Sequence, residues 1–179
     1  MAPLASMPHS VHLFLEQVSH NLWKDAFFYL NGPHVLQAGP QAGNDWEEAT
    51  GLNTRELALK PFRELELAHL AFPEYSADFP HVPWSIGFTG RPGGPDFYIN
   101  KMDNTIPHGP GGQYQHDLDE FGDPCFAKVV SGYDTLHAIF SLSTYGDDSQ
   151  YDHFLKEPVR IVNAVVKAHE ESNLGIADS

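Results

Sequence analysis

The chain has 179 residues, 41% of them hydrophobic and 12% aromatic, which is enough for one domain with a sizeable core. Its formal net charge of −14 argues against nucleic acid and anionic membranes, because phosphates are bound through Lys and Arg. No run of about 20 apolar residues is present, so we expect no membrane span in this chain. The start lacks the basic region and apolar core of a signal peptide. We therefore expect a soluble domain, cytoplasmic by default, and leave open an upstream targeting or anchor segment.

The first predicted element is a helix that opens at Ser6-Met7-Pro8, with Ser6 as its N-cap and Pro8 in the first turn. Its apolar face has the spacing i, i+3, i+4, i+7 and consists of Val11, Phe14, Leu15 and Val18. His9 and His12 lie off that face. No third ligand accompanies them, so they indicate an exposed helix surface and not a metal site.

Two short strands are predicted next, over residues 26–30 and 35–39, around an Asn-Gly-Pro-His turn. The following stretch is less regular. Residues 54–70 are rich in leucine but are interrupted by Pro61, which predicts short helical pieces or a loop excursion.

A loop rich in Gly and Pro, residues 90–95, separates an apolar run over 84–88 from an aromatic strand over 97–99. Gly permits φ > 0 and Pro fixes φ, so this loop is predicted to form a rigid, shaped edge. A second Gly-rich stretch, residues 104–115, lacks the Gly-Lys-Ser/Thr of a phosphate loop and is predicted to be a cluster of turns.

The last predicted elements are a strand over 125–130, a helix over 133–140 and a closing strand over 158–166, followed by a polar tail over 167–179. The only cysteine, Cys125, lies in the first of these strands. A lone cysteine excludes an intramolecular disulfide, and an apolar strand predicts a buried, inert thiol.

Four segments, taken in this order, resemble the cyclophilin family of peptidyl-prolyl isomerases: residues 8–14, 27–39, 95–99 and 125–136. The resemblance implies a mainly β fold, a closed antiparallel β-barrel capped by two helices. It implies a domain over residues 1–166, with an irregular insertion at 41–83 and the tail outside it. In the family a strand precedes the first helix. That strand is missing here or supplied from outside the chain, so we expect only marginal stability.

The resemblance places the family's catalytic Arg on Tyr29 and its catalytic Gln on Gln37. It places the pocket Phe on His34 and the next apolar residue on Val35. A phenol is neutral at pH 7 and offers one donor in place of a five-donor guanidinium fork. We therefore expect a degenerate active site.

Further peptide-contacting residues are expected around the Gly/Pro loop. They are Phe88, Tyr98 and Arg91, with His116 as the one histidine near the position of the family's pocket His. Phe97 is expected to point into the core by strand alternation. For Arg91, the rival interpretation is a surface residue paired with Asp96.

Isomerisation of an X–Pro bond twists an amide across a barrier of about 18–20 kcal/mol and needs no metal or cofactor. The function we expect is that of a cyclophilin-type domain that binds proline-containing peptides or proteins and is weakly active or inactive. The alternative is a non-catalytic scaffolding module. A metal enzyme is the third hypothesis, with ligands drawn from His108, His116, Asp117 and Asp119.

Overall fold

A computed structural model describes residues 1–2, 5–40, 54–112, 121–146 and 152–167 of the chain. The helices within these ranges are α1 (Pro8–Ser19), α2 (Thr54–Glu64) and α3 (Tyr133–Phe140). The strands within the same ranges are β1 (Phe27–Asn31), β2 (Val35–Gly39), β3 (Ser85–Phe88), β4 (Phe97–Asn100), β5 (Cys125–Lys128) and β6 (Phe154–Arg160).

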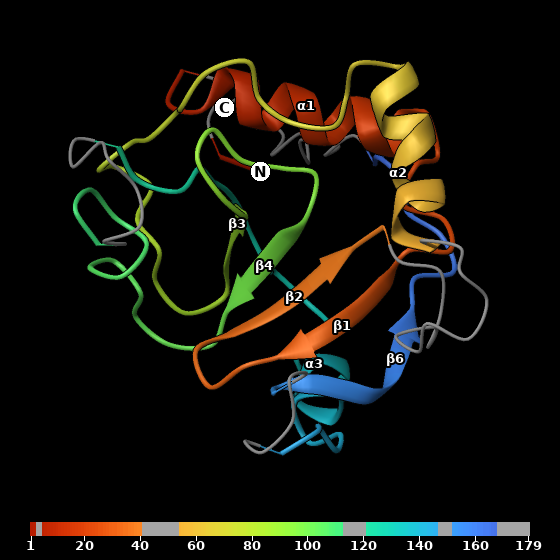
Figure 1. Cartoon of the computed structure of the whole chain (residues 1–179). Coiled ribbons are helices and arrows are strands. Elements are labelled where there is room, and N and C mark those ends of the chain that lie inside the picture. The colour runs from red at the N-terminus through yellow and green to blue at the C-terminus, as the bar shows by residue number, and fades with distance from the viewer. Residues whose placement is uncertain (3–4, 41–53, 113–120, 147–151, 168–179) are drawn as a thin grey trace, which may run out of the picture.

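The strands form one antiparallel sheet in the order β5-β3-β4-β2-β1-β6 (Figure 1). The mainly β class is thereby confirmed. Among the described strands no ladder joins the two edges, β5 and β6. The N-terminal end of the chain lies against β5, where the amide of Ala2 donates to the carbonyl of Phe126 at 2.6 Å.

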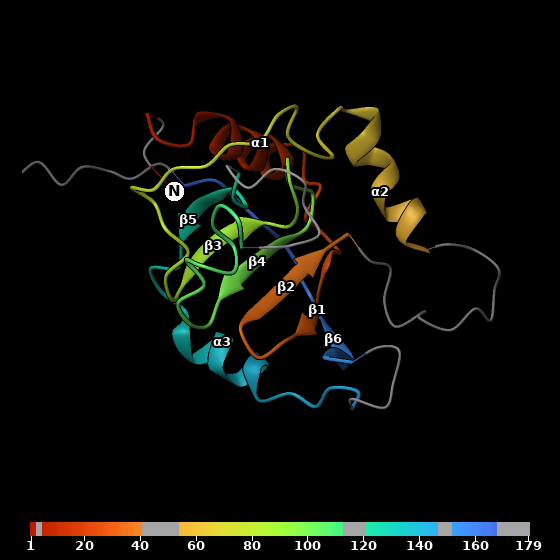
Figure 2. The same cartoon turned by 60° about the vertical axis from the view of Figure 1, so that its left-hand side comes forward.

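The helices cover the two ends of the sheet. Helices α1 and α2 lie at one end and α3 lies at the opposite end (Figures 1 and 2). The sequence predicted two capping helices, and α2 is a third. It forms within the stretch expected to be short helical pieces or a loop, and it continues through Pro61. None of the described helices is long and apolar enough to cross a membrane.

The start of α1 differs from the predicted one. Met7 occupies the N-cap, and neither it nor Ser6 caps the helix with a side chain. Glu74 takes that role, because its carboxylate accepts from the amides of His9 at 3.0 Å and Ser10 at 2.7 Å. A carboxylate suits this position, since it satisfies free N–H groups at the positive end of the helix dipole.

The closing strand also differs from the predicted one. Strand β6 ends at Arg160, because its pairing with β1 runs from Leu30↔Phe154 to Phe27↔Arg160. The predicted strand began inside β6 and ran on to residue 166. Beyond β6 the three valines of that stretch are exposed, with Val162 at 66%, Val165 at 62% and Val166 at 55%.

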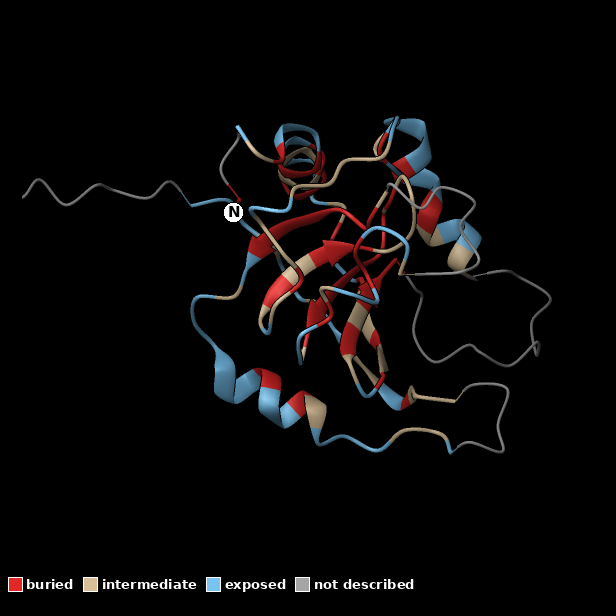
Figure 3. Ribbon diagram, turned by 90° about the vertical axis from the view of Figure 1, so that its left-hand side faces the viewer, coloured by how far each residue is buried: buried red, intermediate tan, exposed pale blue. Residues whose placement is uncertain are grey.

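Alternation along the strands divides the sheet into an inner, apolar face and an outer, polar face. Phe97, Phe88 and Phe126 lie in the hydrophobic core between the sheet and α1, and Phe97 thus occupies the place predicted for it. The central strands β2, β3, β4 and the edge strand β5 are mostly buried, whereas β1 and β6 are mostly intermediate or exposed (Figure 3). The outer face is therefore covered as well, and it is there that polar side chains collect.

Candidate functional site

The outer face of the central strands carries two groups of polar side chains. The ladder register sets Gln37 of β2 and Gly87 of β3 directly beside Tyr98 of β4. We call the first group the Asp96 cluster; it comprises Tyr29, Gln37, Arg55 and Asp96. We call the second the Asp123 cluster; it comprises His81, Arg91, Tyr98, His108 and Asp123.

The Asp96 cluster is built around a buried carboxylate. The Tyr29 hydroxyl donates to Asp96 Oδ2 at 2.6 Å, and Arg55 Nη2 donates to Asp96 Oδ1 at 3.0 Å. Gln37 Nε2 donates to the Tyr29 hydroxyl and lies 3.3 Å from Asp96 Oδ2. Residues from β1, β2 and α2 thus meet at the carboxylate of Asp96, the residue directly before β4.

Close packing holds this carboxylate in place. The Asp96 side chain is only 6% exposed, and a Cβ added at Gly39 would lie 2.5 Å from its Oδ1. Only glycine at position 39 leaves room for the carboxylate where it lies.

The electrostatics of the Asp96 cluster fix two protonation states. Burial raises the pKa of Tyr29 well above its ordinary value, and the neighbouring Asp96 carboxylate raises it further. Tyr29 is therefore a neutral donor. Burial opposes the charge on Arg55, but the Asp96 carboxylate outweighs that effect and raises the Arg55 pKa, so the guanidinium stays charged.

The Arg55 guanidinium has a nitrogen that makes no hydrogen bond to the described residues. Its side chain is 36% exposed, and Nη2 is the nitrogen that binds Asp96. Its Nη1 is buried and has no hydrogen-bond partner among the described residues. A buried donor without a partner costs about 1–3 kcal/mol, so such groups in folded proteins are uncommon and point to strain or to an absent acceptor.

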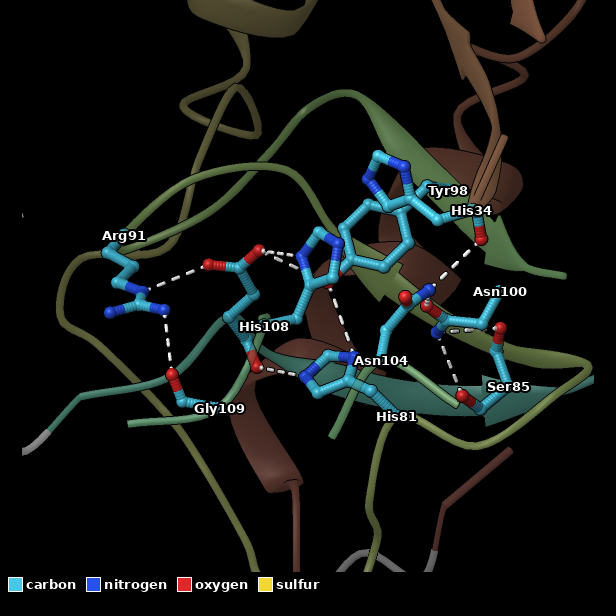
Figure 4. Close-up of polar contacts among 10 residues, drawn as sticks. His34, His81, Ser85, Arg91, Tyr98, Asn100, Asn104, His108 and Gly109 are labelled. Carbon is cyan, nitrogen blue, oxygen red and sulfur yellow. Dashed lines mark hydrogen bonds and ion pairs between the residues drawn. The ribbon is translucent and has the colours of Figure 1, made fainter. Parts of the chain in front are cut away.

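The Asp123 cluster is also built around a buried carboxylate (Figure 4). Arg91 Nε donates to Asp123 Oδ1 at 3.0 Å, while Arg91 Nη2 donates to the carbonyl of Gly109 at 3.0 Å. On the other oxygen, Oδ2, lie His108 Nδ1 at 2.6 Å and the Tyr98 hydroxyl at 3.2 Å. Burial raises the pKa of Asp123, but His108 and Arg91 together outweigh it and hold the pKa below the ordinary value.

Within this cluster, His81 is a buried, neutral imidazole. Its Nε2 is 2.9 Å from the carbonyl of Asp123, so Nε2 carries the proton and Nδ1 faces the Tyr98 hydroxyl at 3.3 Å. Burial lowers the pKa of His81 to about 4. A Cβ at Gly87 would lie 2.8 Å from the Tyr98 hydroxyl, so this glycine makes room for the phenol.

His108 covers the ring of Tyr98. The two ring centroids are 4.6 Å apart, and the His108 ring also stacks on His34 with centroids at 5.6 Å. The loop before His108 is held by Asn104, whose side chain donates to the carbonyl of His34 at 3.0 Å (Figure 4). The space above the predicted pocket aromatic is thus filled by a side chain of the same chain.

The structure brings several predicted site residues together. Tyr29 and Gln37 touch in the Asp96 cluster, and Tyr98 and Arg91 share Asp123 in the other cluster. His34 joins the edge of the second cluster, and burial, with His108 nearby, lowers its pKa.

Other predicted residues lie elsewhere. Phe88 is fully buried and stacks on Phe126 at 4.3 Å, so it packs in the core and does not face a peptide. Val35 is 5% exposed. The Arg91 side chain is only 4% exposed and is bound to Asp123. Arg91 is therefore neither a residue of an open groove nor a surface partner of Asp96. His116, with Asp117 and Asp119, lies outside the described residues.

Sequence reasoning missed Arg55, Asp96 and Asp123 as site residues and considered His108 only as a metal ligand. The described part of the chain contains no group of three His, Cys, Asp or Glu residues that could hold a metal ion. Cys125 is buried as predicted, and burial raises the pKa of its thiol to about 12.

No model of a known protein family matches the chain, and no curated protein matches it by sequence. Solved structures do match. The chain has the fold of the cyclophilin-type peptidyl-prolyl isomerases, as the sequence resemblance implied.

Two of these structures are of a cyclophilin-type peptidyl-prolyl cis-trans isomerase from Cryptosporidium parvum. One was obtained in the presence of the dipeptide Ala-Pro; its TM-score to this chain is 0.52 at 14% sequence identity, and the match covers 89% of each chain. The other has a TM-score of 0.53 at 14% identity and covers 90% of this chain and 88% of that one. At this identity the likeness shows the fold alone.

Proposed function

We propose that this cyclophilin-like domain binds proline-containing peptides or protein segments on its outer face and isomerises them weakly or not at all. The observation that carries the proposal is the state of Tyr29. Its hydroxyl is buried and donates to Asp96 at 2.6 Å, at the position where the resemblance places the catalytic Arg.

The chemistry explains why this substitution matters. A twisted X–Pro amide loses resonance, and its nitrogen gains a lone pair that a cation or strong donor stabilises. A fixed donor aimed at developing charge is commonly worth a factor of about 10²–10³ in rate. The Tyr29 hydroxyl already donates its proton to Asp96, so Tyr29 presents to a peptide neither a charge nor an uncommitted donor.

The surface for a peptide would then be the partly exposed residues along the two clusters. Gln37 and His34 are each only partly buried; Gln37 lies beside Tyr98 in the sheet, and His34 stacks on His108, which covers Tyr98. The net charge of −14 favours a neutral or basic segment as partner and disfavours nucleic acid.

A non-catalytic scaffolding module is the second candidate, and the position of His108 favours it. Its ring lies 4.6 Å from the ring of Tyr98 and stacks on His34, so it occupies space in which a proline ring would have to lie. In this alternative the polar face holds the domain together and a different surface engages the partner.

The test is an isomerase assay on a short Ala-Pro peptide beside an NMR titration of the labelled chain with the same peptide. We expect binding, with isomerisation at least about a hundredfold slower than for a typical cyclophilin. Full-rate isomerisation would contradict the degenerate site. Absence of binding would favour the scaffolding candidate.

The variant Tyr29→Arg provides a second test of the proposed function in the same isomerase assay. If the rest of the groove functions, the new guanidinium should raise the isomerisation rate; an unchanged rate would favour the scaffolding candidate. Tyr133→Arg is the matched control, because Tyr133 is an exposed tyrosine on α3 and the variant adds the same charge away from the outer face.

A further inference from the structure

Arg55 differs from the other arginines of the chain. Its Nη2 binds the buried carboxylate of Asp96, and its Nη1 has no acceptor among the described residues. The chain has four arginines. Arg91 is buried and uses both Nε and Nη2 within the Asp123 cluster. Arg63 and Arg160 are exposed and face Glu56 and Asp25 at the surface.

The anchor of Arg55 fixes where its free donor points. Asp96 binds Nη2 at 3.0 Å, and Asp96 is itself held by Tyr29 at 2.6 Å and by the narrow space at Gly39. The guanidinium is planar, so fixing Nη2 also fixes Nη1. That nitrogen is buried and has no acceptor among the described residues, while the side chain as a whole is 36% exposed.

We propose that Arg55 is the peptide-contacting cation of this domain, donating from Nη1 to a backbone carbonyl oxygen of the bound proline-containing segment. The inference rests on the proposed function and names the residue that would perform it. It assigns to α2 the contact that β1, with Tyr29, does not offer, and it replaces Arg91 as the expected guanidinium of the site.

The charges around Arg55 favour a neutral acceptor over a carboxylate or phosphate. Asp96 already compensates the guanidinium charge at 3.0 Å, and the chain as a whole carries −14. An anionic ligand at Nη1 would meet the Asp96 carboxylate across the same guanidinium. A peptide carbonyl satisfies the donor without that repulsion, and a donor held in advance loses little side-chain freedom on binding.

The experiment compares three forms of the full chain in an NMR titration with a short Ala-Pro peptide: wild type, Arg55→Lys and Arg63→Lys. Lys keeps a positive charge near Asp96 but loses the fork that presents Nη1. We expect peptide affinity to fall about tenfold in Arg55→Lys, the loss of one charge-assisted hydrogen bond. Arg63→Lys, on the same helix but exposed and paired with Glu56, should bind as the wild type does.

The outcomes separate the inference from the proposed function. If the wild type binds and Arg55→Lys binds equally well, Arg55 is only the counter-ion of Asp96 and the inference is overturned while the proposed function stands. If the wild type does not bind, both are overturned. Should Arg55→Lys fail to fold, the double variant Arg55→Met with Asp96→Asn removes both charges together; retained affinity there would overturn the inference, and a loss of about tenfold would support it.

Discussion

The Asp96 and Asp123 clusters use the same parts on the same face of the sheet, yet they leave their arginines in different states. Each holds a buried carboxylate between a tyrosine hydroxyl and a guanidinium. The Arg91 side chain is 4% exposed and donates to Asp123 and Gly109. The Arg55 side chain is 36% exposed, and its Nη1 has no acceptor among the described residues. We interpret Arg91, which is bound through two nitrogens, as part of the framework, and Arg55, which is bound to Asp96 through one nitrogen, as the arginine that has a donor left for a ligand.

The largest loss of stability is expected for Arg91→Ala, which tests the assignment of Arg91 to the framework. Removing one member of a buried ion pair typically costs about 3–5 kcal/mol, and here it leaves Asp123 with His108 and the Tyr98 hydroxyl as its remaining partners. Urea unfolding followed by circular dichroism measures the change. Arg63→Ala, which breaks an exposed pair, is the control and should leave stability unchanged. A stable Arg91→Ala variant with weakened peptide binding would reverse our assignment of Arg91 as framework.

A second prediction concerns the pH dependence of the Asp123 cluster. The pKa of His81 is about 4 in the folded chain, against about 6.5 when unfolded, so the unfolded state binds the extra proton between these values. Stability is therefore full above pH 6.5 and falls as the pH drops towards 4, by about 3 kcal/mol in all. The lowered pKa of Asp123 acts below that window, because its contribution is present above about pH 3.9.

Thermal unfolding from pH 7 to pH 4.5 measures this loss. His81→Gln should flatten the pH profile over that range, and His12→Gln, an exposed histidine on α1, should leave it as in the wild type. A wild-type profile that is flat over this window would show that His81 is not buried in the neutral form.

The smallest expected effect is that of Tyr29→Phe. Asp96 would lose its 2.6 Å hydrogen bond from the phenol but keep Arg55, so we expect a loss of about 2 kcal/mol in unfolding free energy. Tyr133→Phe removes an exposed hydroxyl and serves as the control in the same denaturant titration. A loss as large as that of Arg91→Ala would mean that the Asp96 cluster depends on Tyr29 as strongly as the Asp123 cluster depends on Arg91.

Local patterns and the family resemblance together predicted most of the fold. The bounds of β2, predicted from a short strand-like run, and of α3, predicted from the resemblance of residues 125–136 to a strand that leads into a helix, agree with the structure. The end of β6 was wrong because the valines after Arg160 look like a strand but have no partner in the described part of the chain. A strand exists only where another strand pairs with it, and one sequence does not show the pairing.

The candidate site was harder to predict, because its contacts join distant positions. Tyr29 and Asp96 are 67 residues apart, and Arg55 and Asp96 are 41 apart. Family resemblance located Tyr29 and Gln37, yet no local pattern links Arg55 to either. One signal was present: Gly87 stands inside an apolar strand, and a glycine there often marks a close approach, here that of the Tyr98 hydroxyl.

The carboxylate of Glu74 that closes the start of α1 has a consequence for the order in which the chain folds. Glu74 lies 64 residues beyond Ser10, so the first turn of the helix gains its cap only after that length of chain has looped back. Closing a long loop costs conformational entropy of the chain, and the hydrogen bonds of the cap offset that cost only once the loop is closed. The first turn of α1 is therefore expected to become protected against amide hydrogen exchange later than the rest of the helix, whose amides bond to carbonyls within the helix.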